Sequence, residues 1–159
     1  METLLQTQYN GVKSARQALL SYCGSMDSVA LLKPVPAFNN SSISSLLVHT
    51  ANTYLHWLVF VDGETPVNYF KEDDIEGITD IQSIYRQVDA AVNNFLTKYA
   101  DDYQQVCNKK LPARDKTIAV TPLELFTHAI THEFHHKGQI LTMSRQLGYT
   151  PVDTDVIRT

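Results

Sequence analysis

The sequence has few cysteines and no long apolar run. Its two cysteines, Cys23 and Cys107, cannot form a disulfide network for a chain of 159 residues, so we expect reduced thiols and a cytoplasmic location. The N-terminal residues lack the basic segment and the apolar stretch of a secretory signal peptide. No run approaches the ~20 apolar residues that a membrane-spanning helix needs, so we expect no contact with a membrane.

Basic residues are also in the minority. The chain has 13 Lys and Arg against 17 Asp and Glu, a formal net charge of −4, which argues against a nucleic-acid partner. With 6 Gly and 6 Pro it is neither collagen-like nor of low complexity. Hydrophobic residues make up 43% and charged residues 19%, as in globular proteins, so we expect a single domain over residues 1–159.

Apolar residues recur with helical spacing in four blocks. We expect helices over about residues 3–22, 43–62, 78–99 and 122–147, and hence an all-α fold with long connections, most simply a four-helix bundle. Prolines at positions 34 and 36 exclude a helix there. Residues 106–120 have β-branched ends and a turn-like middle, which indicates a short hairpin or an irregular loop.

Two of these helices have recognisable start signals. Before the last helix, Thr121 is a candidate N-cap, Pro122 suits the first helical position, and Glu124 completes a capping box. For the third helix, Thr79 and Gln82 fit a capping box, with a start a few residues earlier as the alternative.

Histidines are concentrated in the last predicted helix. Four of the six lie within nine residues, at positions 128, 132, 135 and 136. On a helical wheel His128, His132, His135 and Gln139 share the side opposite the apolar face, and His136 lies at the border. Residues four apart are neighbours on a helix surface, so His132 and His136, or His128 and His132, can grip one metal ion. A solvated polar face is the alternative.

The string from His132 to His136 also matches the HExxH pattern of zinc peptidases, in which the two histidines bind zinc and the glutamate is the general base. Those enzymes need a further ligand, usually downstream, and no His or Glu follows His136. We therefore rank a peptidase low. Glu133 is the candidate catalytic base, but it lies about 100° around the helix from His132, which favours an exposed surface carboxylate.

His49, midway along the second predicted helix, is the candidate third ligand. Metal sites in helical bundles are built from inward side chains on facing helices. With His132 and His136 it would provide three neutral nitrogen ligands and leave an open position, the layout of a catalytic site. Spacing alone does not show that His49 faces the last helix, and a buried histidine with a polar companion is the alternative.

The mid-helix His49, the aromatic Trp57 in the same helix and the run from His128 to Ile140 together resemble the DinB-like (damage-inducible) superfamily. Its members carry a similar His-x-x-x-His-(Arg/Lys)-Gly-Gln motif, and the likeness continues through residues 145–148, Arg-Gln-Leu-Gly, before a tail with proline. Lys137 stands where arginine is commoner, and His135 stands where many relatives have an aromatic or another residue.

This resemblance implies a four-helix bundle that holds a divalent metal, zinc or nickel in first place, with His49, His132 and His136 as a histidine triad. Relatives are often dimers, so we expect a homodimer. They include S-transferases that use bacillithiol, mycothiol or glutathione-type thiols, and a related isomerase.

The expected function is a metal-dependent S-transferase, in which the site activates a low-molecular-weight thiol toward a small-molecule substrate. The alternatives are a metal-dependent hydrolase with the same site, a non-enzymatic metal-binding bundle and the peptidase. His128 or Gln139 is expected to orient a ligand imidazole. His135, His56 and Trp57 are candidate pocket residues, although for His56 a capping or solvent-facing position is favoured.

Overall fold

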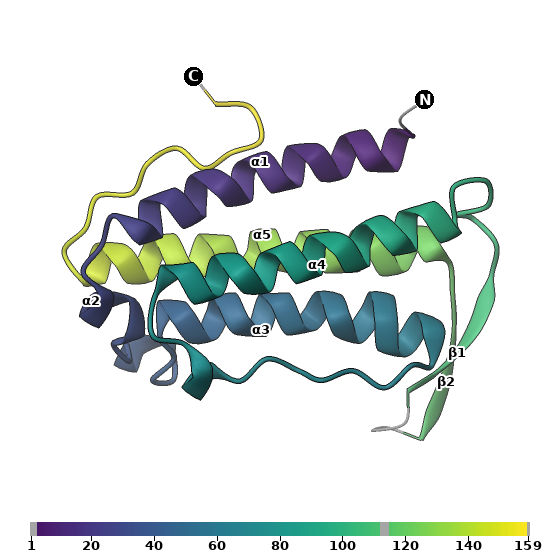
Figure 1. Cartoon of the computed structure of the whole chain (residues 1–159), viewed down its shortest axis with the longest axis horizontal. Coiled ribbons are helices and arrows are strands. Elements are labelled where there is room, and N and C mark those ends of the chain that lie inside the picture. The colour runs from purple at the N-terminus through teal and green to yellow at the C-terminus, as the bar shows by residue number, and fades with distance from the viewer. Residues whose placement is uncertain (1–2, 112–114, 159) are drawn as a thin grey trace.

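The computed structural model describes residues 3–111 and 115–158 (Figure 1). Within them the chain is mostly helical, as expected, with five α-helices and one two-stranded sheet. In chain order these elements are α1 (Leu4–Gly24), α2 (Ser28–Leu32), α3 (Ile43–Leu55), α4 (Ile78–Lys98), β1 (Cys107–Leu111), β2 (Lys116–Val120) and α5 (Pro122–Gln146). No helix among the described residues is long and apolar enough to cross a membrane.

Helix starts follow local capping chemistry. The α5 signal is confirmed: the Thr121 hydroxyl accepts from the Glu124 N–H at 3.1 Å, and the Glu124 carboxylate accepts from the Thr121 N–H at 2.7 Å. The predicted Thr79–Gln82 box of α4 is wrong. The helix begins at Ile78, and the Asp80 carboxylate accepts from the N–H groups of the two residues before it.

The connection between α1 and α3 contains two short elements that were not predicted. Asp27 caps the short α2 by accepting from the Val29 N–H at 2.8 Å, and Pro36 opens a 3-10 turn, η1 (Pro36–Phe38). The described part of the chain therefore has five α-helices where four were expected. The hairpin before α5 is confirmed, with β1 and β2 antiparallel in a register that pairs Cys107 with Val120.

The second predicted helix is one continuous element that changes its pitch. After α3 the backbone widens into a π-helical segment, η2 (His56–Val61). Such segments are rare and often lie at functional sites, because the wider turn redirects the side chains that follow. Here the segment begins at His56 and Trp57, both of which line a pocket.

The core lies where the apolar faces of the four long helices meet. Figure 1 shows α1, α3, α4 and α5 running side by side, with the hairpin at one end and the C-terminal segment returning along α1. Helix α3 packs against both α4 and α5. The largest fully buried side chains include Tyr9 of α1, Tyr54 of α3 and Phe126 of α5. Because α3 and α5 are neighbours, polar residues on their facing surfaces can meet.

Candidate metal centre

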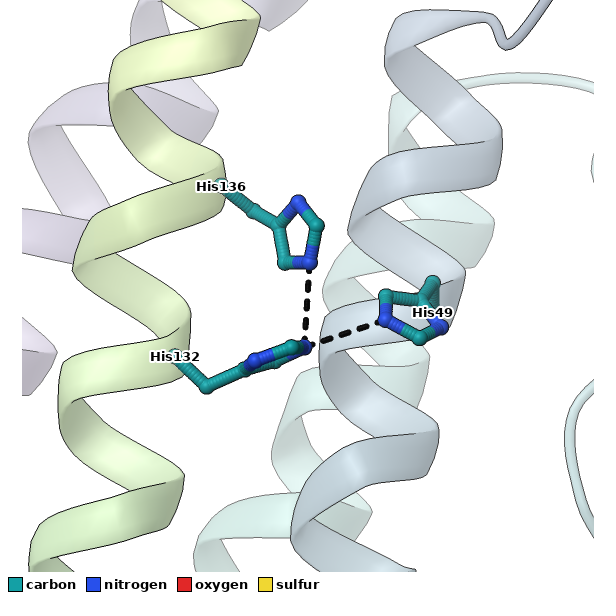
Figure 2. A group of neighbouring side chains, drawn as sticks. All are labelled: His49, His132 and His136. Atoms are coloured by element: carbon teal, nitrogen blue, oxygen red, sulfur yellow. Dashed lines mark hydrogen bonds between the residues drawn. The ribbon is translucent and has the colours of Figure 1, made fainter. Parts of the chain in front are cut away.

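Three histidines from two facing helices converge on one point (Figure 2). His49 comes from α3, and His132 and His136 lie one turn apart on α5. The Nε2 atom of His132 is 3.0 Å from the Nε2 atom of His49 and 3.0 Å from that of His136. One ring nitrogen from each residue lies within 4.8 Å of the others, so the group could hold a metal ion. The expectation that His49 faces the last helix is met.

The donor atoms fit a divalent cation. His136 Nδ1 lies 2.6 Å from Gln139 Oε1, which only accepts hydrogen bonds, so Nδ1 carries the proton and the Nε2 lone pair faces the cluster. A divalent cation would take the place of any proton shared between the three Nε2 atoms and bind their lone pairs. Zinc–imidazole bonds of about 2.0–2.1 Å place the nitrogens of a tetrahedral site about 3.3 Å apart, close to the 3.0 Å of the two pairs that include His132.

The surroundings keep two of these imidazoles neutral. Burial, reinforced by the neighbouring histidines, lowers the pKa of His132 to about 4. Burial also lowers the pKa of His136, an effect that the Gln139 hydrogen bond partly opposes. Because a metal ligand must present a lone pair, the neutral form favoured at pH 7 is the form that binds.

A cavity of about 310 Å³ adjoins the cluster and includes His49 and His132 in its wall. The rest of its lining comes from η2, α3, α5 and one loop residue, namely Asn52, Thr53, His56, Trp57, Tyr69 and His128. The loop that carries Tyr69 is fixed to α3 through the next residue. The Asn52 side-chain amide donates to the Phe70 carbonyl and accepts from the Phe70 N–H, both at 2.9 Å. The phenol oxygen of Tyr69 lies 2.9 Å from His56 Nδ1.

The DinB family model matches residues 1–159. The chain belongs to the DinB family. A DinB-like protein of known structure from Bacillus cereus ATCC 10987 has the same fold, with a TM-score of 0.68 and 18% sequence identity over 96% of this chain and 97% of that chain. No curated protein matches the chain. The resemblance found in the sequence is therefore confirmed at the level of family and fold.

The other predicted residues of this DinB-family chain have different surroundings. Gln139, rather than His128, makes the hydrogen bond to a cluster imidazole. The His128 ring packs 4.8 Å from Trp57 and 5.9 Å from His132, at the edge of the pocket. His135 is exposed, with its ring 4.9 Å from that of His136. His56 is partly buried, lines the pocket and lies beside the Tyr69 hydroxyl.

Glu133 differs most from expectation. Its exposed fraction is 6%, so the interpretation as a surface carboxylate is wrong. Its Oε1 accepts from Arg16 Nε at 2.7 Å, and its Oε2 accepts from Arg16 Nη2 at 2.8 Å and from the Tyr54 hydroxyl. A base at this position would have to give up one of these bonds. These contacts favour a structural role for Glu133, as the partner of Arg16 in a buried ion pair, over the role of a peptidase base.

Sequence reasoning missed Tyr69, Asn52 and Arg16. Tyr69 and its neighbours belong to an irregular loop with no periodicity to read. Asn52 and Arg16 lie within recognised helices, but one is polar and the other charged, so neither marks an apolar face. Only a pattern of polar residues on the inner faces of the helices could have pointed to them.

Proposed function

We propose that this DinB-family chain is a divalent-metal-dependent S-transferase that joins a low-molecular-weight thiol to a small electrophilic molecule. The observation that carries the proposal is the convergence of three imidazole nitrogens at the wall of an aromatic-lined cavity. Three neutral ligands leave the charge of a cation uncompensated and one position open, which is the layout of catalytic rather than structural sites.

The proposed metal ligands are His49, His132 and His136, with Gln139 fixing the orientation of the His136 ring. Imidazole ligands suit zinc and nickel, which we favour. A divalent ion there would supply a Lewis-acid position that lowers the pKa of a thiol toward neutral pH.

The cavity selects for a small substrate with a flat, apolar part. Its volume of about 310 Å³ is at the lower end of the range for small-molecule sites. Trp57, His128 and Tyr69 provide aromatic walls, and the Asn52 amide is already committed to the loop backbone. The cavity therefore offers stacking surfaces together with the hydroxyl and imidazole groups needed to handle a proton.

Transfer requires the thiol to release its proton to solvent and its sulfur to form a bond to the electrophilic carbon. The electron pair of the carbon–oxygen bond that breaks stays on the oxygen, which then takes up a proton. We assign this proton to the phenol of Tyr69, with His56 Nδ1 as its partner. Burial raises the pKa of Tyr69 and lowers the pKa of His56, so a protonated phenol faces a neutral imidazole at pH 7.

A thiol-transfer assay tests the proposal. The metal-loaded full chain is incubated with an aromatic epoxide, whose opened oxygen must take up a proton, and with glutathione, bacillithiol or mycothiol in turn, and both thioether formation and thiol loss are measured. We expect turnover with at least one thiol, abolished in His132→Ala and retained in Thr127→Ala, an exposed position on the same helix. Cleavage of an ester by the metal-loaded chain without any thiol would favour the hydrolase instead.

A further inference from the structure

A second cavity, larger than the first, lies between α1 and α4. Its volume is about 680 Å³, within the range of small-molecule sites, and none of the cluster histidines lines it. Its lining is polar and rich in positive charge, with Lys13, Arg16 and Arg86 against one acidic residue, Asp89. Three cations gathered in one cavity contrast with the net charge of −4 of the whole chain.

Arg16 forms a fixed positive charge in the cavity wall. Its exposed fraction is 4%, and its guanidinium lies 4.6 Å from the centre of the Tyr85 ring. Glu133 accepts from Nε and Nη2, Asp89 accepts from Nη1, and the Tyr9 hydroxyl accepts from Nη2. A guanidinium has five N–H groups, so four are used among the described residues, and one on Nη1 is left for a ligand.

The two other cations have no acidic partner of their own. Within residues 3–111 and 115–158, neither Lys13 nor Arg86 forms an ion pair, and the Lys13 ammonium lies 5.6 Å from the centre of the Tyr9 ring. Glu133 already neutralises Arg16, so the charge of Asp89, whose Oδ1 accepts from Arg16 and from the Tyr9 hydroxyl at 2.7 Å each, can offset only one of the two other cations. The cavity therefore keeps a surplus of positive charge.

The C-terminal segment adds a fourth cation at the rim. Arg158 donates from Nη2 to the hydroxyl of Ser14, a residue that lines the cavity. The segment is held along α1, since Val156 lies so close to Gly11 that a β-carbon there would come within 3.1 Å of it. The guanidinium of Arg158, which belongs to neither α1 nor α4, thus lies beside a residue that lines the cavity.

We propose that this cavity binds a small molecule with two or more anionic groups, carboxylate or phosphate. Lys13 and Arg86 would pair with these groups, because both side chains are long enough to close on a ligand and neither forms an ion pair among the described residues. The free N–H of Arg16 would donate to the deepest oxygen. The amides of Gln17 and Gln82 line the cavity and suit the neutral polar part of such a molecule.

Calorimetric titration of the metal-free full chain with citrate and with pyrophosphate, at low ionic strength, tests this proposal. Prior removal of metal prevents either anion from binding through an ion at the histidine cluster. The comparison between citrate and pyrophosphate decides between a carboxylate and a phosphate ligand. The variant is Lys13→Gln with Arg86→Gln. The matched control is Lys110→Gln with Lys116→Gln, which removes the same charge from two exposed hairpin positions.

We expect saturable binding of one anion per chain, weakened by about tenfold or more in the cavity variant and unchanged in the hairpin variant. Equal weakening in both variants would reduce the effect to overall charge and overturn the proposal. Absence of saturable binding by either anion would overturn it as well. Circular dichroism of each variant checks that the fold is retained.

Discussion

Substitution of Glu133 by alanine should destabilise the protein without removing its metal. Glu133 has an exposed fraction of 6% and Arg16 one of 4%, and three hydrogen bonds from Arg16 and Tyr54 end on this carboxylate. Its loss would leave the buried guanidinium with Asp89 as its remaining acidic partner. Removal of one member of a buried ion pair typically costs about 3–5 kcal/mol.

We expect Glu133→Ala to lower the free energy of unfolding by about 3 kcal/mol, at the lower end of that range, because the buried guanidinium loses its bidentate partner and keeps only Asp89. Urea unfolding followed by circular dichroism measures the change, and an unaltered denaturant slope would show that the unfolded state is comparable. The double variant Arg16→Met with Glu133→Leu should be less destabilised than Glu133→Ala, since it buries no unpaired charge.

Metal content separates this structural role from a catalytic one. Glu133→Ala should keep the metal stoichiometry of the wild type, because none of its hydrogen bonds goes to a cluster histidine. A loss of stability under about 1 kcal/mol, as for an exposed ion pair, would show that burial adds nothing to the contribution of this ion pair. Loss of the metal in a folded Glu133→Ala variant would show that the ion pair is not the main role of this carboxylate.

Three further results are expected. Gln139→Ala should weaken metal affinity by about 10-fold to 100-fold, measured by competition with a chelator, because His136 loses the acceptor that fixes its tautomer; Gln139→Glu should retain most of the affinity. Tyr69→Phe should lower kcat of thiol transfer by about 100-fold or more with an unchanged metal content, and an unaltered kcat would exclude the phenol as proton donor. The metal-free protein should lose stability as the pH falls from 6.5 toward 4. The folded state lowers the pKa of His132 from 6.5 to about 4, so in this range it binds fewer protons than the unfolded chain. Urea unfolding at each pH measures the decline, which should be smaller in His132→Asn.

The sequence predicted those elements whose signals are local. Thr121, Pro122 and Glu124 start α5 where expected, and Gly148, with a φ of +91°, follows its end in the left-handed conformation that favours glycine. The four long helices could be recognised because each buries one apolar stripe. The short α2 could not, since five residues carry too little periodicity to detect.

Part of the candidate site could be predicted from the sequence for a related reason. His132 and His136 are four residues apart on one helix, so their proximity needs no tertiary information. The placement of His49 depended on the family resemblance, because a helical wheel does not tell which neighbour a face meets. The ion pair of Glu133 joins residues 117 positions apart, and the wheel of α5 alone misassigned it to the surface.

The identity of the thiol, the homodimer and the cytoplasmic location stay predictions. All three depend on partners or surroundings outside the chain. Analytical ultracentrifugation at several protein concentrations would test the dimer directly.

Elemental analysis of the protein, purified without a histidine tag, is the decisive test of the three-histidine metal site. We predict about one divalent ion per chain in the wild type and none in folded His49→Ala or His136→Ala, because two remaining imidazoles hold a metal too weakly. Absence of metal from the wild type, even after addition of zinc or nickel, would rule out the site. Full metal content in His49→Ala would exclude His49 as a ligand, since α3 would then contribute no donor atom.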